Sequence, residues 1–241
     1  MTVTTQKIAI LQPSYLPWLG FFDQMVQADT FVFLDDIQYT RRDWRNRNRI
    51  RTKDDWAWLT VPVLQKDKFQ QSLLDTQIDN SLKWRHKHLQ AIHHNYVRSP
   101  YFELYFPYFE SLYNQEWNYL VDLCYETLRY LCEVLDIHTP TLKSSELNAG
   151  GAKDGKILAI CKKLNATHYL TGNKAKDYLS AEAFAEQNII LEYHDYVHPE
   201  YPQQFPGFVP YLSVIDALFN LGEKCRERLT QKHTQVDKSA S

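Results

Sequence analysis

Five short strand-like segments, each four or five residues long and some of them almost entirely apolar, recur along this 241-residue chain, and longer segments with a helical repeat separate most of them. Short apolar runs are typical of strands buried on both faces, and strands that alternate with helices pair in parallel. The sequence therefore predicts an α/β fold in which helices flank a parallel sheet. The predicted strands are residues 7–11, 31–34, 139–142, 167–170 and 189–193, with a further strand at 56–63 that Pro62 places at an edge or a strand end.

A helical stretch interrupts this alternation. Between residues 81 and 136, three successive segments carry apolar residues at helical spacing. We expect residues 81–136 to be a helical insertion into an α/β core that comprises residues 1–80 and 137–222. Residues 223–241 are expected to hold the end of the last helix and a polar, disordered tail.

Composition narrows the classes of function. The net charge is −2, so the chain lacks the broad basic surface that duplex or general RNA binding requires, and no nucleic-acid partner is expected. No stretch approaches about 18 apolar residues, so no membrane span is predicted. The four cysteines are widely spaced, which fits a reducing cytoplasm. The sequence leaves the oligomeric state open.

A run of arginines follows the second predicted strand. Six arginines lie within eleven residues, from Arg41 to Arg51, in a predicted loop. Arginine forks match phosphate or carboxylate oxygens two at a time, and open α/β sheets bind ligands just beyond their strand ends. The alternative is a solvated surface whose arginines pair with nearby acids. The predicted phosphate-binding residues are Arg41, Arg42, Arg45, Arg47 and Arg49.

Two adjacent carboxylates, Asp35 and Asp36, separate the strand from the arginine run. Neighbouring side chains of a strand point to opposite sides, so we expect one carboxylate, Asp36, to face a cleft. It is a candidate general base, or a holder of Mg²⁺ with substrate phosphates. The alternative is that it pairs with the arginines that follow.

Two groups of histidines differ in their expected roles. His86 and His93 share one helix face without a third ligand, so a solvated helix face is the better interpretation and no metal site is predicted. His198 stands before Pro199 in the loop after the last predicted strand. There it is a candidate general acid or base, with the capping of a turn as the alternative.

The first strand runs into the turn QPSYLPWLGFF at residues 12–22. A turn between a strand and a helix is where α/β folds present backbone N–H groups to anions. Adenylyl-transferring enzymes of the HIGH-motif class carry His-x-Gly-His here, whereas this chain has Trp18 and Phe21 around Gly20. The spacing predicts a related nucleotide-binding architecture, and the missing imidazoles argue against the same phosphate chemistry. The alternative is a tight turn packed with aromatic rings.

A second turn, Gly172-Asn173-Lys174, follows the strand predicted at 167–170. It lacks the spacing of a Walker motif. Asn173 and Lys174 are nevertheless candidates for contact with phosphate or sugar. The alternative is an ordinary turn with a solvated lysine.

Several motifs together resemble the WbqC-like protein family over roughly residues 7–222. They occur in the order IAILQPSYLPWLGFFDQM, FVFLDDIQYTRRDWRNRNRI, WLTVPV, YLTGNKAKDYL, HPEYPQQF and LSVIDALFNLG. Members of this family resemble proteins encoded in bacterial O-antigen and surface-polysaccharide clusters, often near sugar aminotransferases. The resemblance thus implies a pathway more firmly than a reaction.

In that context, the expected partner of the arginines is the diphosphate of a nucleotide sugar. The resemblance and the HIGH-like turn together predict acyl or aminoacyl transfer to an amino sugar, by a transferase or by an amide-forming ligase with ATP and magnesium as its candidate cofactor. The rival prediction is a non-catalytic binding or scaffold protein. Asp36 and His198 are the predicted catalytic residues. The predicted substrate-binding residues are Gln12, Tyr15, Trp18, Gln38, Tyr39, Trp44, Asn46, Asn48, Asn173, Lys174 and Tyr201.

Overall fold

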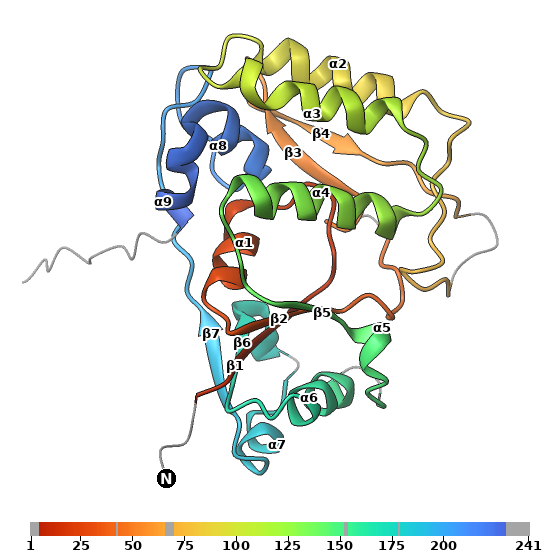
Figure 1. The fold of residues 1–241 in the computed structure, drawn as a ribbon, viewed down its shortest axis with the longest axis vertical. Helices are drawn as coiled ribbons and strands as arrows, with labels where there is room; N and C mark the ends of the chain where they lie inside the picture. Colours follow the sequence, from red (N-terminus) through yellow and green to blue (C-terminus); the bar gives the residue numbers. More distant parts are fainter. Residues whose placement is uncertain (1–4, 42, 66–69, 152–153, 178, 230–241) are drawn as a thin grey trace, which may run out of the picture.

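A parallel sheet forms the lower part of the molecule (Figure 1). The computed structural model describes residues 5–41, 43–65, 70–151, 154–177 and 179–229, and within these residues five strands follow the order β5-β2-β1-β6-β7. Helices lie on both faces, so the predicted α/β fold with a parallel, helix-flanked sheet is confirmed. The strands are β1 (Lys7–Leu11), β2 (Thr30–Phe33), β5 (Thr141–Lys143), β6 (His168–Gly172) and β7 (Ile190–His194).

The strand order reverses beside β1. From β1 the chain moves outward through β2 to β5, and it then returns to the other side of β1 to form β6 and β7. Because the strands are parallel, their carboxyl ends share one edge of the sheet. Open α/β sheets bind ligands at this edge, close to such a reversal.

The stretch predicted as a helical insertion, residues 81–136, does form helices. They pack above the sheet, as Figure 1 shows, together with two helices from the end of the chain. Residues 230–241, the greater part of the expected disordered tail, lie outside the described residues. The helices are α1 (Leu19–Val26), α2 (Trp84–Tyr96), α3 (Phe102–Asn114), α4 (Leu120–Val134), α5 (Ser144–Leu147), α6 (Asp154–Lys163), α7 (Ala181–Ala185), α8 (Val214–Leu221) and α9 (Cys225–Leu229), with short 3₁₀ turns η1 (Asn173–Asp177) and η2 (Gly222–Lys224).

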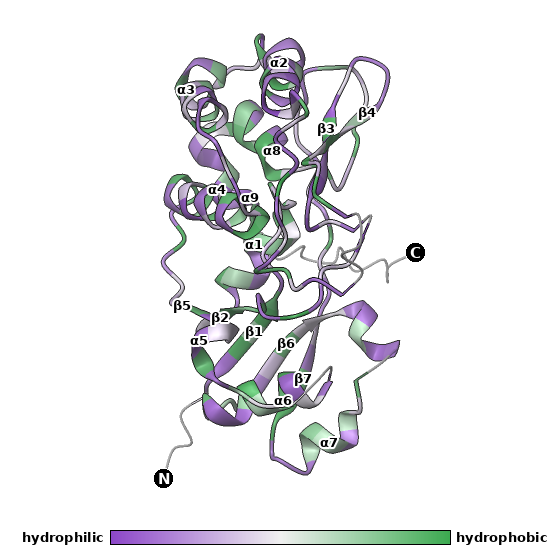
Figure 2. Ribbon diagram, turned by 90° about the vertical axis from the view of Figure 1, so that its right-hand side faces the viewer, coloured by the Kyte–Doolittle hydropathy of each residue, from purple (hydrophilic) through white to green (hydrophobic). Residues whose placement is uncertain are grey.

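Side chains of the central strands alternate between two hydrophobic cores. Ala9 and Phe31 belong to the larger core, which includes residues of α1, α4 and α8. Ile8 and Ile10 belong to a smaller core with residues of α6 and α7. Because successive residues of a strand point to opposite faces, burial on both sides requires apolar residues at nearly every position. Figure 2 shows the resulting concentration of hydrophobic residues in β1 and α8.

The second half of the arginine run is a strand, and the loop predicted there is wrong. β3 (Arg47–Arg51) pairs with the antiparallel strand β4 (Trp56–Thr60) in a two-stranded sheet apart from the main one. Asn48 and Ile50 are buried, whereas Arg47 and Arg49, which alternate with them, are partly exposed on the other face of the strand. Arg51, the last residue of the strand, is buried. Polar residues on both faces concealed the period of two that identifies a strand.

The β3–β4 sheet packs against the helical insertion. His88 of α2 donates its Nε2–H to the Thr60 carbonyl of β4 at 3.1 Å, and Ile50 and Leu59 belong to the larger core. Burial lowers the pKa of His88 to about 4, so this imidazole is neutral and acts as a structural hydrogen-bonding group. The chain division predicted at residue 81 stays a prediction.

A buried carboxylate, Asp216 of α8, ties three chain segments together. It accepts hydrogen bonds from Tyr96 Oη, Tyr201 Oη and Gln203 Nε2, each at 2.9 Å. Burial raises the pKa of Asp216 to about 6, although these donors act in the opposite direction. Tyr201, predicted to bind substrate, is therefore a buried structural residue.

We expect the replacement Asp216→Asn to remove a pH dependence of folding stability. Because the folded-state pKa is raised from 3.8, the folded state holds its proton more tightly, and stability is lost as pH rises through about 6. The loss is about 3 kcal/mol by pH 7. Denaturant unfolding of both proteins from pH 4 to 8 should show that the free energy of unfolding of the variant increases relative to that of the wild type as pH rises. Parallel curves would contradict this role.

Candidate functional site

A cavity of about 590 Å³ opens at the carboxyl edge of the sheet, beside the ends of β1 and β2. Gln12 follows β1, and Asp36 and Gln38 follow β2. The structure thus brings together three residues that the sequence predicted separately. The lining consists of Gln12, Leu34, Asp36, Ile37, Gln38, Thr40, Gly151, Asp154, Lys156 and Ile157.

Asp36 is the central charged group of this cavity. Its carboxylate forms an ion pair with Lys156 of α6 and accepts a hydrogen bond from Ser144 Oγ. Partial burial raises its pKa, but the hydrogen bonds from Lys156 and Ser144 outweigh this and hold the pKa of Asp36 below its usual range. The side chain is 26% exposed and ionised at neutral pH. It is available to a ligand as a fixed anion.

Asp35 points away from the cavity and has a structural role. It is 1% exposed and accepts hydrogen bonds from Tyr125 Oη, Ser145 Oγ and the Ser145 backbone N–H, at 2.8 to 2.9 Å. These bonds fasten the end of β2 to the start of α5. Only one of the two carboxylates faces the cavity, as the alternation of a strand predicted.

Arg45 is the arginine that the structure places at this edge. Its Nε donates to Gln12 Oε1, its Nη1 donates to Ser14 Oγ at 2.8 Å, and its Nη2 lies 3.5 Å from Asp43. Through Gln12, its guanidinium is attached to the wall of the cavity. Arg41 is exposed and donates to the Gln65 carbonyl at 2.9 Å. Arg42 lies outside the described residues.

Arg47 and Arg49 lie elsewhere, on the outward face of the β3–β4 sheet. Arg47 Cζ lies 4.2 Å from the centre of the Trp58 ring, and Arg49 Cζ lies 5.5 Å from that of Trp44. Neither arginine lines the cavity. The predicted clamp of successive arginines is therefore divided between two surfaces, because successive residues of an extended segment diverge.

Several predicted substrate contacts are buried and hold the fold instead. Tyr15 is fully buried, and its Oη forms hydrogen bonds with His88 Nδ1 and Tyr113 Oη. Tyr39 is 5% exposed, and burial raises its pKa to about 12. Asn46 Nδ2 donates to the Val61 carbonyl at 2.8 Å, and Asn48 Nδ2 donates to the Leu16 carbonyl at 2.6 Å. In each case burial takes the side chain away from an open site.

His198 does not share the cavity with Asp36. Its Nδ1–H donates to the Pro199 carbonyl at 3.0 Å, and burial lowers its pKa, so the ring is neutral. The ring contacts Tyr201 and Tyr211 at centroid distances of 6.0 and 5.2 Å. The structure therefore does not bring Asp36 and His198, the two predicted catalytic residues, into one cavity.

Trp18 covers the start of α1. Its indole lies over Gly20 and contacts Tyr196 and Tyr211 at centroid distances of 5.1 and 5.6 Å. The aromatic residues that replace the HIGH histidines thus form an aromatic-packed turn. This turn covers the helix end that would otherwise present backbone N–H groups to phosphate.

Asn173 and Lys174 are exposed in η1, directly after β6. Asn173 Nδ2 donates to the His194 carbonyl at 3.3 Å. Both residues lie at the ligand-binding edge of the sheet but do not line the cavity. Their substrate contacts remain predictions.

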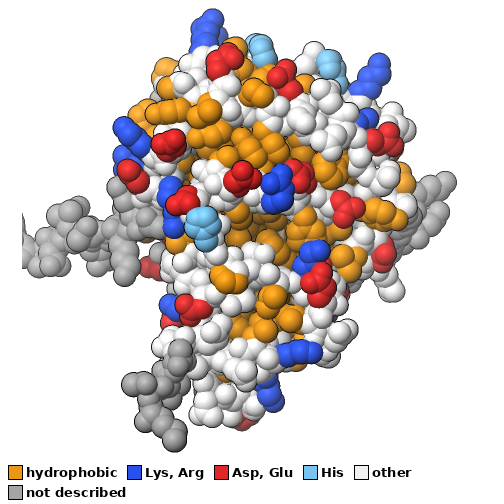
Figure 3. Space-filling model, viewed as in Figure 1, with side chains coloured by type: hydrophobic (Ala, Val, Ile, Leu, Met, Phe, Trp, Pro, Cys, Tyr) orange, Lys and Arg blue, Asp and Glu red, His pale blue; other side chains and the backbone are white. Residues whose placement is uncertain are grey.

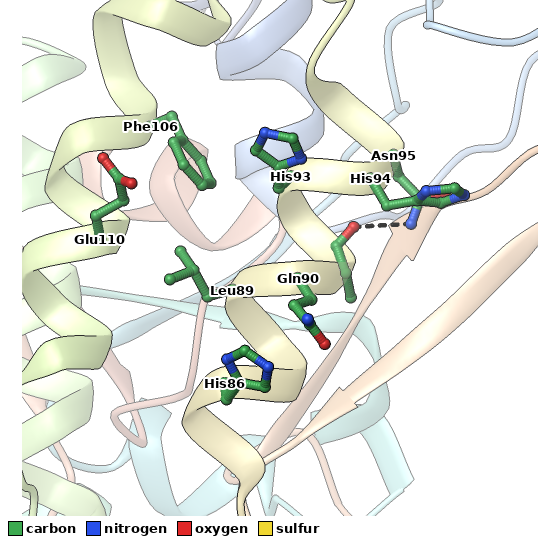
Figure 4. A pocket seen from close by; sticks show the side chains of 9 residues that line it. His86, Leu89, Gln90, His93, His94, Asn95, Phe106 and Glu110 are labelled. Atoms are coloured by element: carbon green, nitrogen blue, oxygen red, sulfur yellow. Dashed lines mark hydrogen bonds between the residues drawn. The ribbon is translucent and has the colours of Figure 1, made fainter.

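A larger hollow, of about 750 Å³, lies between α2 and α3 (Figure 4). His93 packs against Phe102 and Phe106 there, at centroid distances of 5.5 and 5.4 Å. Among the residues that the structure describes, no group of three or more His, Cys, Asp or Glu side chains is placed to hold a metal ion. This hollow lacks the strand-end carboxylate and cations of the first cavity, which we regard as the candidate site.

The model of the WbqC-like protein family matches residues 12–228, nearly the whole chain. The chain belongs to the WbqC-like protein family. The uncharacterized protein Rv1507c of Mycobacterium tuberculosis (strain ATCC 25618 / H37Rv) is 34% identical over 226 residues, which are 93% of this chain and 97% of that protein. No solved structure matches the chain. The resemblance is thus confirmed, and membership indicates a role associated with polysaccharides.

The WbqC-like chain shows no field of a single charge sign on the face seen in Figure 3. Hydrophobic side chains gather over its helical part, and acidic and basic groups are interspersed among them. Within the described ranges, no helix is long and apolar enough to cross a membrane.

Sequence reasoning missed Ser144 and Lys156, which hold Asp36. Ser144 directly follows β5, so the rule that drew attention to Asp36 would have found it as well. Lys156 lies just after Gly150 and Gly151, on a helix with other lysines. The sequence around Lys156 gives no signal that this side chain reaches the end of β2. Only the packing of α6 against the sheet places Lys156 beside Asp36.

Two glycine replacements should have opposite effects on stability. A Cβ at Gly20 would overlap the Trp18 indole, which neighbouring rings hold in place, so Gly20→Ala should cost about 1–3 kcal/mol. A Cβ at Gly155 of α6 would meet no atom within 4 Å, so Gly155→Ala should gain about 0.5–1 kcal/mol. Denaturant unfolding at one pH measures both values. A stabilised Gly20→Ala protein would show that Trp18 is free to move.

Proposed function

We propose that this WbqC-like protein transfers an acyl or aminoacyl group to a nucleotide-linked amino sugar during bacterial surface-polysaccharide assembly. The observation that carries the proposal is the cavity at the strand ends, where an ionised Asp36 and a partly buried Lys156 lie together. Amides of Gln12 and Gln38 and the hydroxyl of Thr40 provide hydrogen bonds for sugar hydroxyls. The cavity volume suits a small ligand.

Asp36 is suited to bind and deprotonate an amine. An amino sugar carries an ammonium group at neutral pH, and a fixed carboxylate attracts it by a charge-assisted hydrogen bond. The ammonium first gives up one proton to solvent, which frees the lone pair of the nitrogen. As the resulting amine attacks the acyl carbon, a second proton on that nitrogen becomes acidic and passes to Asp36. The carbonyl oxygen gains negative charge in the same step, and Lys156 offers a cation for it. Collapse forms the amide and expels the leaving group of the acyl donor.

Arg45 is suited to bind the phosphate part of such a substrate. Its guanidinium is oriented by Gln12 and Ser14 before any ligand arrives, which reduces the entropy lost on binding. A forked cation next to the sugar-binding cavity matches a diphosphate linked to the sugar. In this proposal Arg45, rather than the whole arginine run, recognises the nucleotide.

The ligase alternative, with ATP and magnesium, has less support. Trp18 covers the start of α1, and the two histidines of the HIGH motif are absent, so these residues do not fit the phosphates of ATP. We therefore favour a donor whose acyl group is already activated. One observation favours the non-catalytic alternative, a nucleotide-sugar binding or scaffold protein. The ion pair with Lys156 offsets the charge of the Asp36 carboxylate and makes it a weaker base.

The replacement Asp36→Asn should reduce the rate of transfer much more than it reduces the affinity for the nucleotide sugar. An amide cannot accept the proton of the attacking amine, so the rate should fall by about 10²–10⁴. Product formation is measured by mass spectrometry with UDP- or dTDP-linked amino sugars and a panel of acyl donors. Nucleotide-sugar affinity, measured on the same variant, should fall by less, about ten- to a hundredfold, because one charge-assisted pair with the ammonium group is lost. Binding without turnover in the wild type, across the whole panel, would support the scaffold alternative.

The replacement Arg45→Ala should weaken nucleotide-sugar binding by about ten- to a hundredfold, since one charge-assisted pair is lost, on the order of 1.5–3 kcal/mol. Arg45→Lys should also weaken it, because a point charge cannot replace the fork. Arg47→Ala is the matched control, because Arg47 lies over Trp58 on the outward face. Calorimetric affinity and melting temperature separate binding from folding. A lower melting temperature with unchanged affinity would give Arg45 a structural role only.

A further inference from the structure

Another hollow, of about 340 Å³, lies where the start of α2 meets the end of α3. It is separate from the candidate site at Asp36 and shares only His86 and Leu89 with the hollow shown in Figure 4. Its volume is at the lower end of the range for ligand pockets. We call it the Arg85 hollow, and it is lined by Asn80, Leu82, Lys83, Arg85, His86, Leu89, Tyr113 and Asn114.

Three basic side chains, those of Lys83, Arg85 and His86, line the Arg85 hollow, and no acidic side chain does. The surrounding sequence, residues 80–102, holds four Lys or Arg, four His and no Asp or Glu, in a chain whose net charge is −2. Glu110 lines the neighbouring hollow but not this one. Within the described residues, none of the three basic side chains forms an ion pair, whereas surface charges commonly pair with nearby acids.

The stability of α2 does not account for these charges. The partial positive charge at the start of a helix favours acidic side chains in the first turn and disfavours cations. The first turn of α2 nevertheless has no acidic residue and no side-chain cap, and it carries Arg85 and His86. A negatively charged ligand in the hollow would compensate for this unfavourable arrangement.

Hydrogen bonds prepare the walls of the hollow for such a ligand. Arg85 Nη1 donates to the Gln115 carbonyl, which orients the guanidinium, and Arg85 Nη2 forms no hydrogen bond within the described chain. Asn80 accepts from Trp84 Nε1 at 3.3 Å and donates from its Nδ2 to the Trp117 carbonyl at 2.9 Å. A guanidinium that is already oriented loses less entropy when it binds an anion.

We propose that the Arg85 hollow binds a sugar phosphate, with the phosphate group between Arg85 and Lys83. A phosphate monoester carries nearly two negative charges and three acceptor oxygens. A dianion therefore matches three basic side chains better than a single carboxylate does, and the forked guanidinium donates to two of its oxygens at once.

The rest of the lining suits a small sugar. The exposed carboxamide of Asn114 offers a donor and an acceptor to hydroxyl groups, and Leu82 and Leu89 offer apolar surface to ring carbons. A nucleic acid fits less well, because Tyr113 is 4% exposed and presents no open ring on which a base could stack. This site does not depend on the reaction proposed at Asp36.

Calorimetric titration of the full chain with glucose 1-phosphate tests the site, with glucose as the neutral comparison. Glucose 1-phosphate should bind at least about tenfold more tightly, because only the phosphate forms charge-assisted hydrogen bonds. In an NMR titration, the ring signals of His86 should shift, whereas those of His138, an exposed histidine beside Asp136, should not. Equal affinity for glucose, or no shift at His86, would overturn the proposal.

Variants of α2 separate a specific site from a general attraction of charges. Lys83→Gln should lower the affinity for glucose 1-phosphate about tenfold without lowering the melting temperature, because it removes a cation from the start of a helix. Arg85→Lys should also bind more weakly, since a point charge cannot replace the fork. Lys87→Gln is the matched control, because this exposed lysine of the same helix lines the hollow beside Trp58 instead. An equal loss of affinity in Lys87→Gln would contradict a site at Arg85.

Two further measurements identify the place and the source of the phosphate. Arg45→Ala, at the candidate active site, should retain the affinity for glucose 1-phosphate, and its loss there would move the binding away from the Arg85 hollow. Sedimentation with vesicles that contain phosphatidate should be weak and independent of Lys83. Strong sedimentation that Lys83→Gln abolishes would assign the hollow to a lipid headgroup and overturn the proposal of a soluble sugar phosphate.

Discussion

The attachment of the β3 segment to the turn after β1 holds the two halves of this protein together. Asn48 binds the Leu16 carbonyl, and the Tyr15 backbone N–H donates to the Arg45 carbonyl at 3.1 Å. Leu16 is fully buried with a φ of 45°, a left-handed conformation that a leucine adopts only where its surroundings hold it. The main sheet and the helical part therefore share one core, and Arg45 is carried to the cavity by the same contacts.

The arginine run serves more than one purpose. Arg51 is buried and donates to three backbone carbonyls, those of Thr52, Asp55 and Pro206, so it ties loops together. Arg47 and Arg49 stiffen a row of indoles, and Arg45 lies beside the strand-end cavity. A guanidinium can stack on a ring and donate in its plane at the same time, which a lysine cannot. This versatility explains why one short run supports a turn, a sheet surface and a candidate site.

The candidate site combines an anion and a cation in a small volume. Asp36 is ionised because Lys156 and Ser144 stabilise its charge, and a paired carboxylate of this kind binds an ammonium group better than it abstracts a proton from a weak acid. That property agrees with amine recognition in the proposed transfer. It also explains why the scaffold alternative needs a direct test of turnover, since binding alone would use the same groups. Membership of the WbqC-like protein family places either activity in a polysaccharide-associated role.

The sequence by itself determined the elements of the α/β sheet, most of its helices and the family. The sequence pattern identified β1, β2, β6 and β7 to within two residues. In β1 and β2, burial on both faces leaves a nearly continuous apolar run. The strand-end rule also found Asp36 and Gln12. Only the tertiary structure decided which polar residues are buried, how the arginines are divided and that Lys156 reaches Asp36. Tyr15, Asn48 and Tyr201 are residue types that often contact ligands, but their side chains form hydrogen bonds with distant segments of this chain. Such partners are set by long-range folding, for which a single sequence carries no local signal.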